Sequence, residues 1–167
     1  TTNATGEWVK TTIAYSVGIF NGVPYGTSIA VDNAGKAHIS YRVYRTYTDS
    51  DLIYSTNVSG AWVNTNVVNA VIIGASKIAV DGSGKVHISY YADGHSSLKY
   101  ATNATGVWVK KTIDSEIVSS CCSIAVAADE GGKVHISYGS FDYPNSGGST
   151  LKYATNASGS WVITAVD

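Results

Sequence analysis

The sequence predicts an all-β fold built from repeated four-stranded antiparallel units. One pattern of short segments occurs three times along the 167 residues. Its segments are rich in β-branched and aromatic residues and are separated by Gly, Asn, Asp and Ser, and no segment keeps a helical period. A hydrophobic content of 44% excludes a disordered chain, and the length suits a single domain.

The first two segments of each repeat form an expected hairpin. The opening segment reads SIAVD or a close variant, at residues 28–32, 77–81 and 123–127. The second reads HISY preceded by Lys and a small residue, at residues 36–41, 85–90 and 133–138. The turns between them begin at Asp32, Asp81 and Asp129 and read D-N-A-G, D-G-S-G and D-E-G-G. We expect tight Asp-initiated turns here, because an EF-type calcium loop needs ligands spread over about 12 residues.

The third and fourth segments form a second hairpin. The third segment reads LIYSTN or LKYATN, at residues 52–57, 98–103 and 151–156. The fourth begins with a tryptophan two residues after a glycine: Trp62, Trp108 and Trp161, with Trp8 at the same position of an earlier copy. The intervening Asn-x-Ser/Thr motifs, at Asn3, Asn57, Asn103 and Asn156, can be glycosylation acceptors or turn residues. Their recurrence with the fold favours the turn.

Four-stranded units of this length, stacked radially, are the blades of a β-propeller. The tryptophans are 54, 46 and 53 residues apart, which places blades at 28–67, 77–113 and 123–166. Residues 1–13 then supply the last strand of a preceding blade. Propellers close with about four to eight blades, so three blades and one strand should not close within one chain. We expect the ring to be completed by copies of the chain or by the rest of a longer repeat protein. The missing Met and the redundant strand favour the longer protein.

Loop lengths indicate which edge of the blades carries function. The connection from the third segment to the fourth has one length in all repeats, and the first hairpin varies by only two residues. The connections from the second segment to the third, and from the fourth to the next repeat, vary by five residues each. All the varied connections lie on one edge of an antiparallel meander, and varied loops on a rigid scaffold usually carry the binding site.

The varied loops supply the candidate ligand-binding residues, which are rich in aromatic and polar groups. They are Tyr25, Arg42, Tyr44, Tyr91, Asp93, His95, Cys121, Cys122, Phe141, Asp142 and Tyr143. A tyrosine offers a flat apolar face and a hydroxyl, which suits a sugar or a peptide. The alternative is that these aromatic residues pack their own loops. The adjacent cysteines either form a strained vicinal disulfide at the channel mouth or are two small residues in a crowded innermost strand.

The sequence predicts neither a metal site nor a cofactor. His38, His87 and His135 occupy one position of the second segment. Equivalent positions of neighbouring blades lie far apart unless they approach the axis, so we expect buried imidazoles that bond from blade to blade rather than zinc ligands. The chain has no nucleophile elbow, no phosphate loop and no cluster of His with carboxylates.

The repeats resemble those of β-propellers in secreted and cell-surface bacterial proteins, on the segments KIAVDGSGKVHISYY at 77–91 and LKYATNATGVW at 98–108. They also have a faint similarity to the Asp-box of sialidase-like propellers, although Ala104 stands where that motif has Asp and Trp108 follows its Gly one residue early. The resemblance implies an extracellular or cell-surface location. No catalytic residue of the sialidase family maps onto this chain.

The function that the sequence favours is a non-catalytic extracellular binding or scaffold module, with a carbohydrate or a peptide as its ligand. A net charge of −1 gives no footprint for nucleic acid, and no apolar run is long enough to insert into a membrane. The alternatives are a part of a propeller glycoside hydrolase or polysaccharide lyase, and a purely structural assembly subunit. Fold alone does not decide among them.

Overall fold

The computed structural model describes residues 6, 8, 10–13, 24–46, 49–71, 73–94, 96–115, 117, 123–141 and 148–166. These residues form twelve strands and no helix, so none of them belongs to a helix that could cross a membrane. The strands form three four-stranded antiparallel sheets. In each sheet the order in space follows the order in the chain, which is the meander that the sequence predicts.

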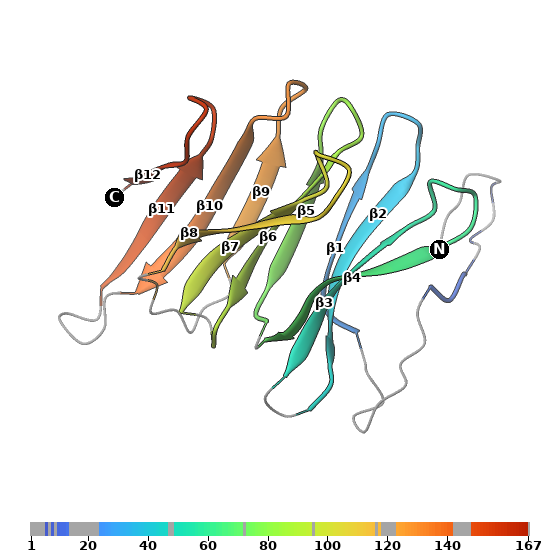
Figure 1. The fold of residues 1–167 in the computed structure, drawn as a ribbon, viewed down its shortest axis with the longest axis horizontal. Coiled ribbons are helices and arrows are strands. Elements are labelled where there is room, and N and C mark those ends of the chain that lie inside the picture. The colour runs from blue at the N-terminus through green and yellow to red at the C-terminus, as the bar shows by residue number, and fades with distance from the viewer. Residues whose placement is uncertain are drawn as a thin grey trace.

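The three sheets are the three blades. Blade 1 contains β1 (Pro24–Val31), β2 (Ala37–Tyr44), β3 (Ser50–Thr56) and β4 (Val63–Val71). Blade 2 contains β5 (Ser76–Val80), β6 (Val86–Ala92), β7 (Ser97–Thr102) and β8 (Val109–Asp114). Blade 3 contains β9 (Ile124–Ala128), β10 (Val134–Phe141), β11 (Ser149–Thr155) and β12 (Val162–Ala165). Figure 1 shows the blades side by side in an open row, so the expected all-β, unclosed propeller architecture is confirmed.

The edge at the top of Figure 1 carries nearly identical tight turns. In the first hairpin of each blade the aspartate Oδ1 accepts a hydrogen bond from the amide of the lysine four residues on, at 2.8, 2.9 and 2.7 Å. The glycine of each turn has φ between 73° and 78°, the left-handed region that suits a residue without Cβ. The second hairpins are tied to the blade by asparagines, since the Oδ1 of Asn57, Asn103 and Asn156 accepts from the first amide of the neighbouring strand.

In the third repeat the first hairpin is two residues longer in sequence than in the others, but strand pairing shows that these two residues are not in its turn. Ile124 pairs with Tyr138 in blade 3 as Ser76 pairs with Tyr90 in blade 2. The Asp129 turn therefore has the same length as its counterparts, and the extra residues lie before β9. The repeat spacing of the sequence alone predicts that Cys121-Cys122 correspond to Ala75-Ser76 of blade 2. Strand pairing shows that this match is wrong by two positions, because Ser123-Ile124 holds that place.

The hydrophobic core lies between blades rather than within one. One cluster joins blades 1 and 2 and includes Leu52, Tyr54 and Ile88, while a second joins blades 2 and 3 and includes Leu98 and Ile136. All five side chains are at most 7% exposed. Each aliphatic side chain buried in this way stabilises the fold by roughly 1.5–3 kcal/mol. Neighbouring blades therefore depend on one another for their stability.

A repeated stack of side chains runs across these interfaces. The Trp108 ring of blade 2 meets the Tyr54 ring of blade 1 edge-on, with centroids 5.3 Å apart, and the Trp161 ring meets Tyr100 in the same way at 5.1 Å. Each tyrosine hydroxyl bonds to the Nδ1 of its blade's histidine, at 2.7 Å for His38 and 2.6 Å in the other two blades. Trp108 and Trp161 thus supply the part of this stack that crosses from one blade to the preceding one.

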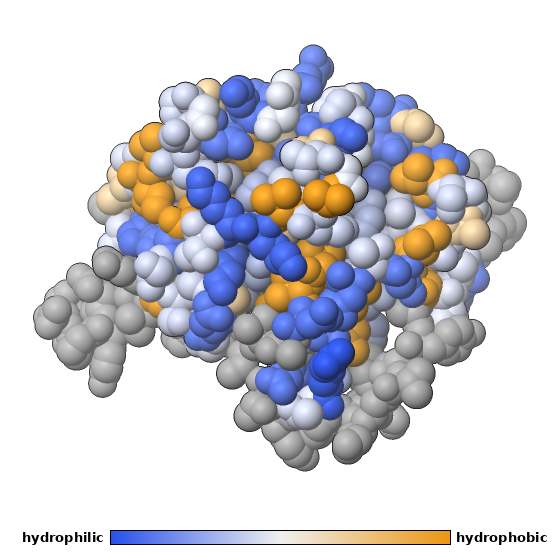
Figure 2. All heavy atoms as spheres, viewed as in Figure 1, coloured by the Kyte–Doolittle hydropathy of each residue, from blue (hydrophilic) through white to orange (hydrophobic). Residues whose placement is uncertain are grey.

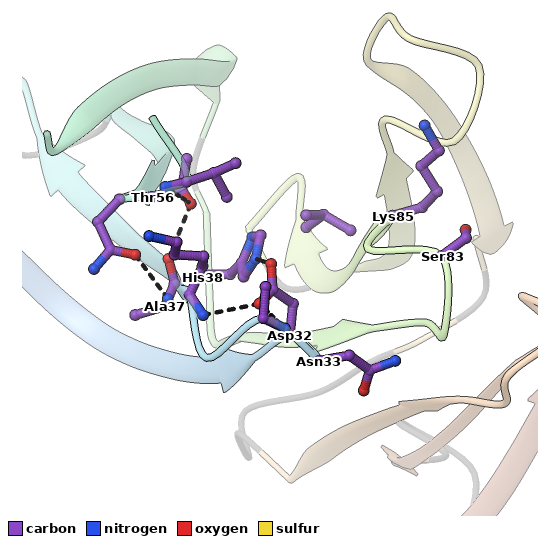
Figure 3. A network of polar contacts seen from close by, with 12 residues as sticks. Asp32, Asn33, Ala37, His38, Thr56, Ser83 and Lys85 are labelled. Carbon is purple, nitrogen blue, oxygen red and sulfur yellow. Dashed lines mark hydrogen bonds and ion pairs between the residues drawn. The ribbon is translucent and has the colours of Figure 1, made fainter. Parts of the chain in front are cut away.

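The histidines bond within their own blades, which corrects the expectation of blade-to-blade hydrogen bonds. The His38 Nε2 lies 3.2 Å from Asp32 Oδ2, and Figure 3 shows this pair beside the turn. The His87 Nε2 lies 3.0 Å from Asp81 Oδ2. A carboxylate can only accept, so Nε2 carries the proton and Nδ1 accepts from the tyrosine hydroxyl. None of the described residues forms a group of three side chains that could hold a metal ion.

The two outward faces of the row expose positions that are buried between blades. Ile29 on blade 1 is 64% exposed, whereas its counterpart Ile78 is 6% exposed. Leu151 on blade 3 is 44% exposed, whereas its counterpart Leu98 is fully buried.

Of the predicted strand over residues 1–13, the described residues 10–13 form no strand. The Ile13 carbonyl accepts a hydrogen bond from Asn64 Nδ2 at 3.2 Å, which holds this segment beside blade 1.

Candidate functional site

Three of the predicted ligand-binding residues meet at the varied-loop edge of blade 1. Tyr25 and Arg42 are cross-strand partners in β1 and β2. The Arg42 guanidinium lies 4.8 Å from the centre of the Tyr44 ring and 5.8 Å from that of Tyr25, and its Nη1 donates to the Ile73 carbonyl at 2.8 Å. Cation–π contacts of this kind contribute about 0.5–1 kcal/mol at exposed sites. Arg42 thus holds the segment around Ile73, which leads from blade 1 to blade 2, against β2. The Tyr25 side chain is 47% exposed, so its ring faces solvent.

Tyr91 is buried rather than exposed at the mouth of the channel. Its side chain is 1% exposed, and its hydroxyl lies 3.1 Å from both the Ser123 and the Gly139 carbonyl oxygens of blade 3. This tyrosine fastens blade 2 to blade 3. In this conformation its ring cannot stack on a ligand, and the sequence could not reveal this because its partners Ser123 and Gly139 belong to another repeat.

Asp93 begins the loop after β6 in the left-handed conformation, with φ of 55°, which aspartate tolerates better than most residues. Its Oδ2 lies 2.7 Å from both the Lys99 Nζ and the Ser97 Oγ. The hydrogen bond from Lys99, followed by that from Ser97, holds the pKa of Asp93 below its usual value. The carboxylate is therefore ionised at neutral pH and occupied by its own loop.

The remaining predicted residues are not placed. His95, Cys121, Cys122, Asp142 and Tyr143 lie outside the described residues, and Phe141 is described only as the last residue of β10. Their roles stay predictions.

A groove lies between blades 1 and 2 in the described part of the chain, and Ala92 at the end of β6 brings it beside one varied loop. Its volume is about 330 Å³, at the lower end of the range for small-molecule sites. It is lined by Val68 and Asn69 of β4, Tyr90 and Ala92 of β6, Lys99 of β7, and Lys110, Lys111 and Thr112 of β8. Figure 2 shows strongly hydrophilic side chains crossing the middle of this side of the molecule beside separate apolar patches.

The described lining of the groove is basic and polar. It contains three lysines, and no carboxylate or histidine is among the described lining residues. Burial, aided by the negative charge of Asp93, raises the pKa of Tyr90 to about 12, so its hydroxyl remains a hydrogen-bond donor at neutral pH. None of the residues predicted from the sequence lines this groove. The available signal was the lysine of LKYATN and the two lysines of WVKK, which lie on adjacent strands.

A second hollow, of about 420 Å³, lies on the outward face of blade 1 and is lined mainly by apolar residues, including Ile13, Ile29, Ile39 and Tyr41. Its walls are the positions that a preceding blade would cover. We therefore assign it to blade packing rather than to a ligand.

Neither a protein-family model nor a curated sequence matches the chain. Solved structures do match its fold. A fucose lectin from Kordia zhangzhouensis, in complex with methyl-fucoside, has a TM-score of 0.54 at 17% identity, over 83% of this chain and 97% of the lectin. A Hadza microbial sialidase has a TM-score of 0.59 at 12% identity, over 86% of this chain and 38% of the sialidase. A polysaccharide lyase has a TM-score of 0.52 at 11% identity, over 83% of this chain and 40% of the lyase. At these identities the similarity shows the fold alone.

Proposed function

We propose that this chain is a non-catalytic, lectin-like module that binds glycans through the groove between blades 1 and 2. The observation that carries the proposal is the groove itself. It opens between two blades, reaches Ala92 beside a varied loop, and is lined by lysine, asparagine, threonine and tyrosine side chains. Such donors suit the hydroxyl groups of a saccharide. The similarity of fold to a fucose lectin, over nearly the whole of that lectin, supports this class of ligand.

The non-catalytic part of the proposal follows from the distribution of carboxylates. Glycoside hydrolysis usually needs two carboxyl groups about 5–10 Å apart across the scissile bond. The described residues of the groove lining include none, and nearby Asp93 is paired with Lys99. Asp51 and Asp114 are both at least 90% buried and lie in different blades, each bonded to its own basic partner.

We further propose that the ring is completed by additional blades, supplied by copies of this chain or by the rest of a longer chain, and that the module acts outside the cell. The outward faces support the first part, since Ile29 and Leu151 occupy positions that are covered at the internal interfaces. A glycan ligand supports the second part, because such ligands are abundant at cell surfaces. A scaffold subunit without a ligand remains the alternative if no saccharide binds.

The fold similarity to a sialidase and to a polysaccharide lyase favours an enzymatic module as the second candidate. In that case the added blades would have to supply the acid–base pair. Release of a product from a glycan substrate by the assembled protein would show that the module is enzymatic and not a lectin.

The test is a glycan screen with the 167-residue chain, followed by calorimetry on two variants. The double variant Lys110→Gln with Thr112→Ala should weaken binding at least fivefold, because it removes two polar groups of the groove. The matched control, Lys36→Gln with Ser83→Ala, changes the turn edge and should bind as the parent does. If no glycan binds, or if the control loses binding and the groove variant does not, the proposed function is wrong.

A further inference from the structure

The interface between blades 2 and 3 contains a carboxylate held by a tyrosine–lysine pair. Tyr138 and Lys152 are cross-strand partners in β10 and β11. Asp114, the last residue of β8, places its Oδ2 2.7 Å from the Tyr138 hydroxyl and 3.0 Å from the Lys152 Nζ. The aspartate is 9% exposed. A buried carboxylate is thus neutralised by a pair of side chains from the following blade.

The same pair is present one interface earlier, without the aspartate. Tyr90 and Lys99 are cross-strand partners in β6 and β7, at the repeat positions of Tyr138 and Lys152. The residue of the preceding blade at the aspartate position is Val68. It pairs with Leu52 as Asp114 pairs with Leu98, and the ladder shifts register at the same point in both blades.

At this interface the apolar side chain of Val68 stands where the next interface has Asp114, so no described carboxylate of blade 1 meets Tyr90 and Lys99. Tyr90 and Lys99 line this groove, together with Val68 and the exposed Lys110. Lys99 instead pairs with Asp93, whose side chain is 42% exposed. Such an exposed ion pair contributes little because solvent screens it, so exchanging Asp93 for another carboxylate costs little.

We infer that the groove between blades 1 and 2 binds the carboxylate of an acidic saccharide, such as a uronic acid, between the Tyr90 hydroxyl and the Lys99 ammonium group. The ligand carboxylate enters from the groove beside Val68 and makes the two polar contacts that Asp114 makes at the next interface, and Lys110 adds a second positive charge. This inference rests on the proposed glycan-binding function and names the class of glycan. Hydrogen bonds between ionised groups are stronger than neutral ones, so the acid should be preferred over its neutral analogue.

The experiment compares methyl glucuronide with methyl glucoside, titrated into the 167-residue chain by calorimetry. The uronide should bind about tenfold more tightly than the glucoside, and salt should weaken only the uronide. The variant Val68→Asp places in the groove the carboxylate that Asp114 provides at the next interface. It should abolish the preference for the uronide while the chain stays folded.

Two further variants keep the result interpretable. Val63→Asp makes the same substitution on the same strand at an exposed position outside the groove, and it should leave uronide binding unchanged. Tyr90→Phe should reduce uronide binding about fivefold with less effect on the glucoside, even if Val68→Asp failed to fold. Equal affinity for the two sugars, or an unaltered preference in both Val68→Asp and Tyr90→Phe, would overturn the inference. Continued binding of neutral glycans in that case would leave the proposed function intact, whereas no binding of any saccharide would overturn both.

Discussion

Trp108 of blade 2 packs edge-on against Tyr54 of blade 1, and the interplanar angle of their rings is 65°. The Tyr54 hydroxyl continues the contact to His38 at 2.7 Å, so an aromatic stack of one blade is closed by the tryptophan of the next. Trp161 repeats this relationship with Tyr100. The tryptophans of blades 2 and 3 therefore each connect their blade to the preceding one.

The first prediction concerns this contact. Trp108→Ala should lower the free energy of unfolding by about 3 kcal/mol, because it removes a large ring from the blade 1–blade 2 interface. Trp62→Ala is the control, since Trp62 meets no aromatic ring among the described residues, and its cost should be less than half as large. Urea denaturation measures both. Equal losses for the two variants would show that the tryptophans do not stabilise the fold through this stack.

The second prediction concerns the asparagine of the second hairpin. Asn103 Oδ1 accepts a hydrogen bond from the Val86 amide at 2.8 Å, and the Gly106 amide donates to the Asn103 carbonyl at 2.8 Å. Asn103→Ala should cost about 1–2 kcal/mol of stability, because it removes an acceptor from a partly buried amide. Asn103→Asp keeps an acceptor and should cost less. Thermal denaturation of the two variants decides the point, and a larger loss for Asn103→Asp would contradict this role.

The third prediction is a contribution of Asp81 to acid stability. Burial disfavours its charged form, but hydrogen bonds from His87, Ser83 and the Lys85 amide outweigh this and lower its pKa to about 2. A carboxyl whose pKa is lower in the folded state stabilises the fold above the unfolded pKa of about 3.9, and this contribution is lost as the pH falls towards 2. About 2 kcal/mol should be lost across that window.

The test of this contribution is urea denaturation of Asp81→Asn between pH 5 and pH 2. The free energy of unfolding of the variant should fall less steeply than that of the parent chain as the pH is lowered from 5 to 2, which is the acid limb of the stability curve. Asp129→Asn is the matched control, because Asp129 holds the same turn in blade 3 but is exposed to solvent. An acid limb that stays as steep in Asp81→Asn as in the parent would exclude Asp81 as the cause.

The fold could be predicted from the sequence because its signals are local and repeated three times. Turn residues such as Asp81 and Asn103 bond to amides within their own blade, so the contacts that form a blade are present in each repeat. The row of blades follows from strand length and connection length alone. The error at Cys121 and Cys122 arose because a short apolar segment can be matched in two registers, and only pairing with β10 selects one.

The candidate site was less predictable because it is formed between repeats. Its loop position predicts Tyr91 as a ligand-binding residue, but contacts with Ser123 and Gly139 of the next blade bury it. Conversely, Val68 becomes informative only once strand register matches it with Asp114 and the groove brings it beside Tyr90 and Lys99. Such information lies in differences between repeats, whereas sequence patterns reveal what the repeats share.

The last prediction is that the chain associates through its outward faces. The exposed face of blade 1 that carries Ile29 is equivalent to the faces of blades 2 and 3 that cover Tyr54 and Tyr100 of the preceding blade. The exposed face of blade 3 carries the equivalent tyrosine, Tyr153, stacked on His135 with ring centroids 6.0 Å apart. Trp62 of one copy can then pack on Tyr153 of the next. Large exposed apolar patches are rare on soluble monomers, so we expect association at micromolar concentration.

Sedimentation measurements on three forms of the chain test this prediction. Ile29→Asp should shift the chain towards monomer by at least tenfold in dissociation constant, because it places a charge on an apolar contact surface. Val107→Asp changes an equally exposed residue, 66% against 64%, on a hairpin turn of blade 2 and should sediment as the parent does. A parent chain that remains a stable monomer, or equal effects of the two variants, would show that these faces do not mediate association.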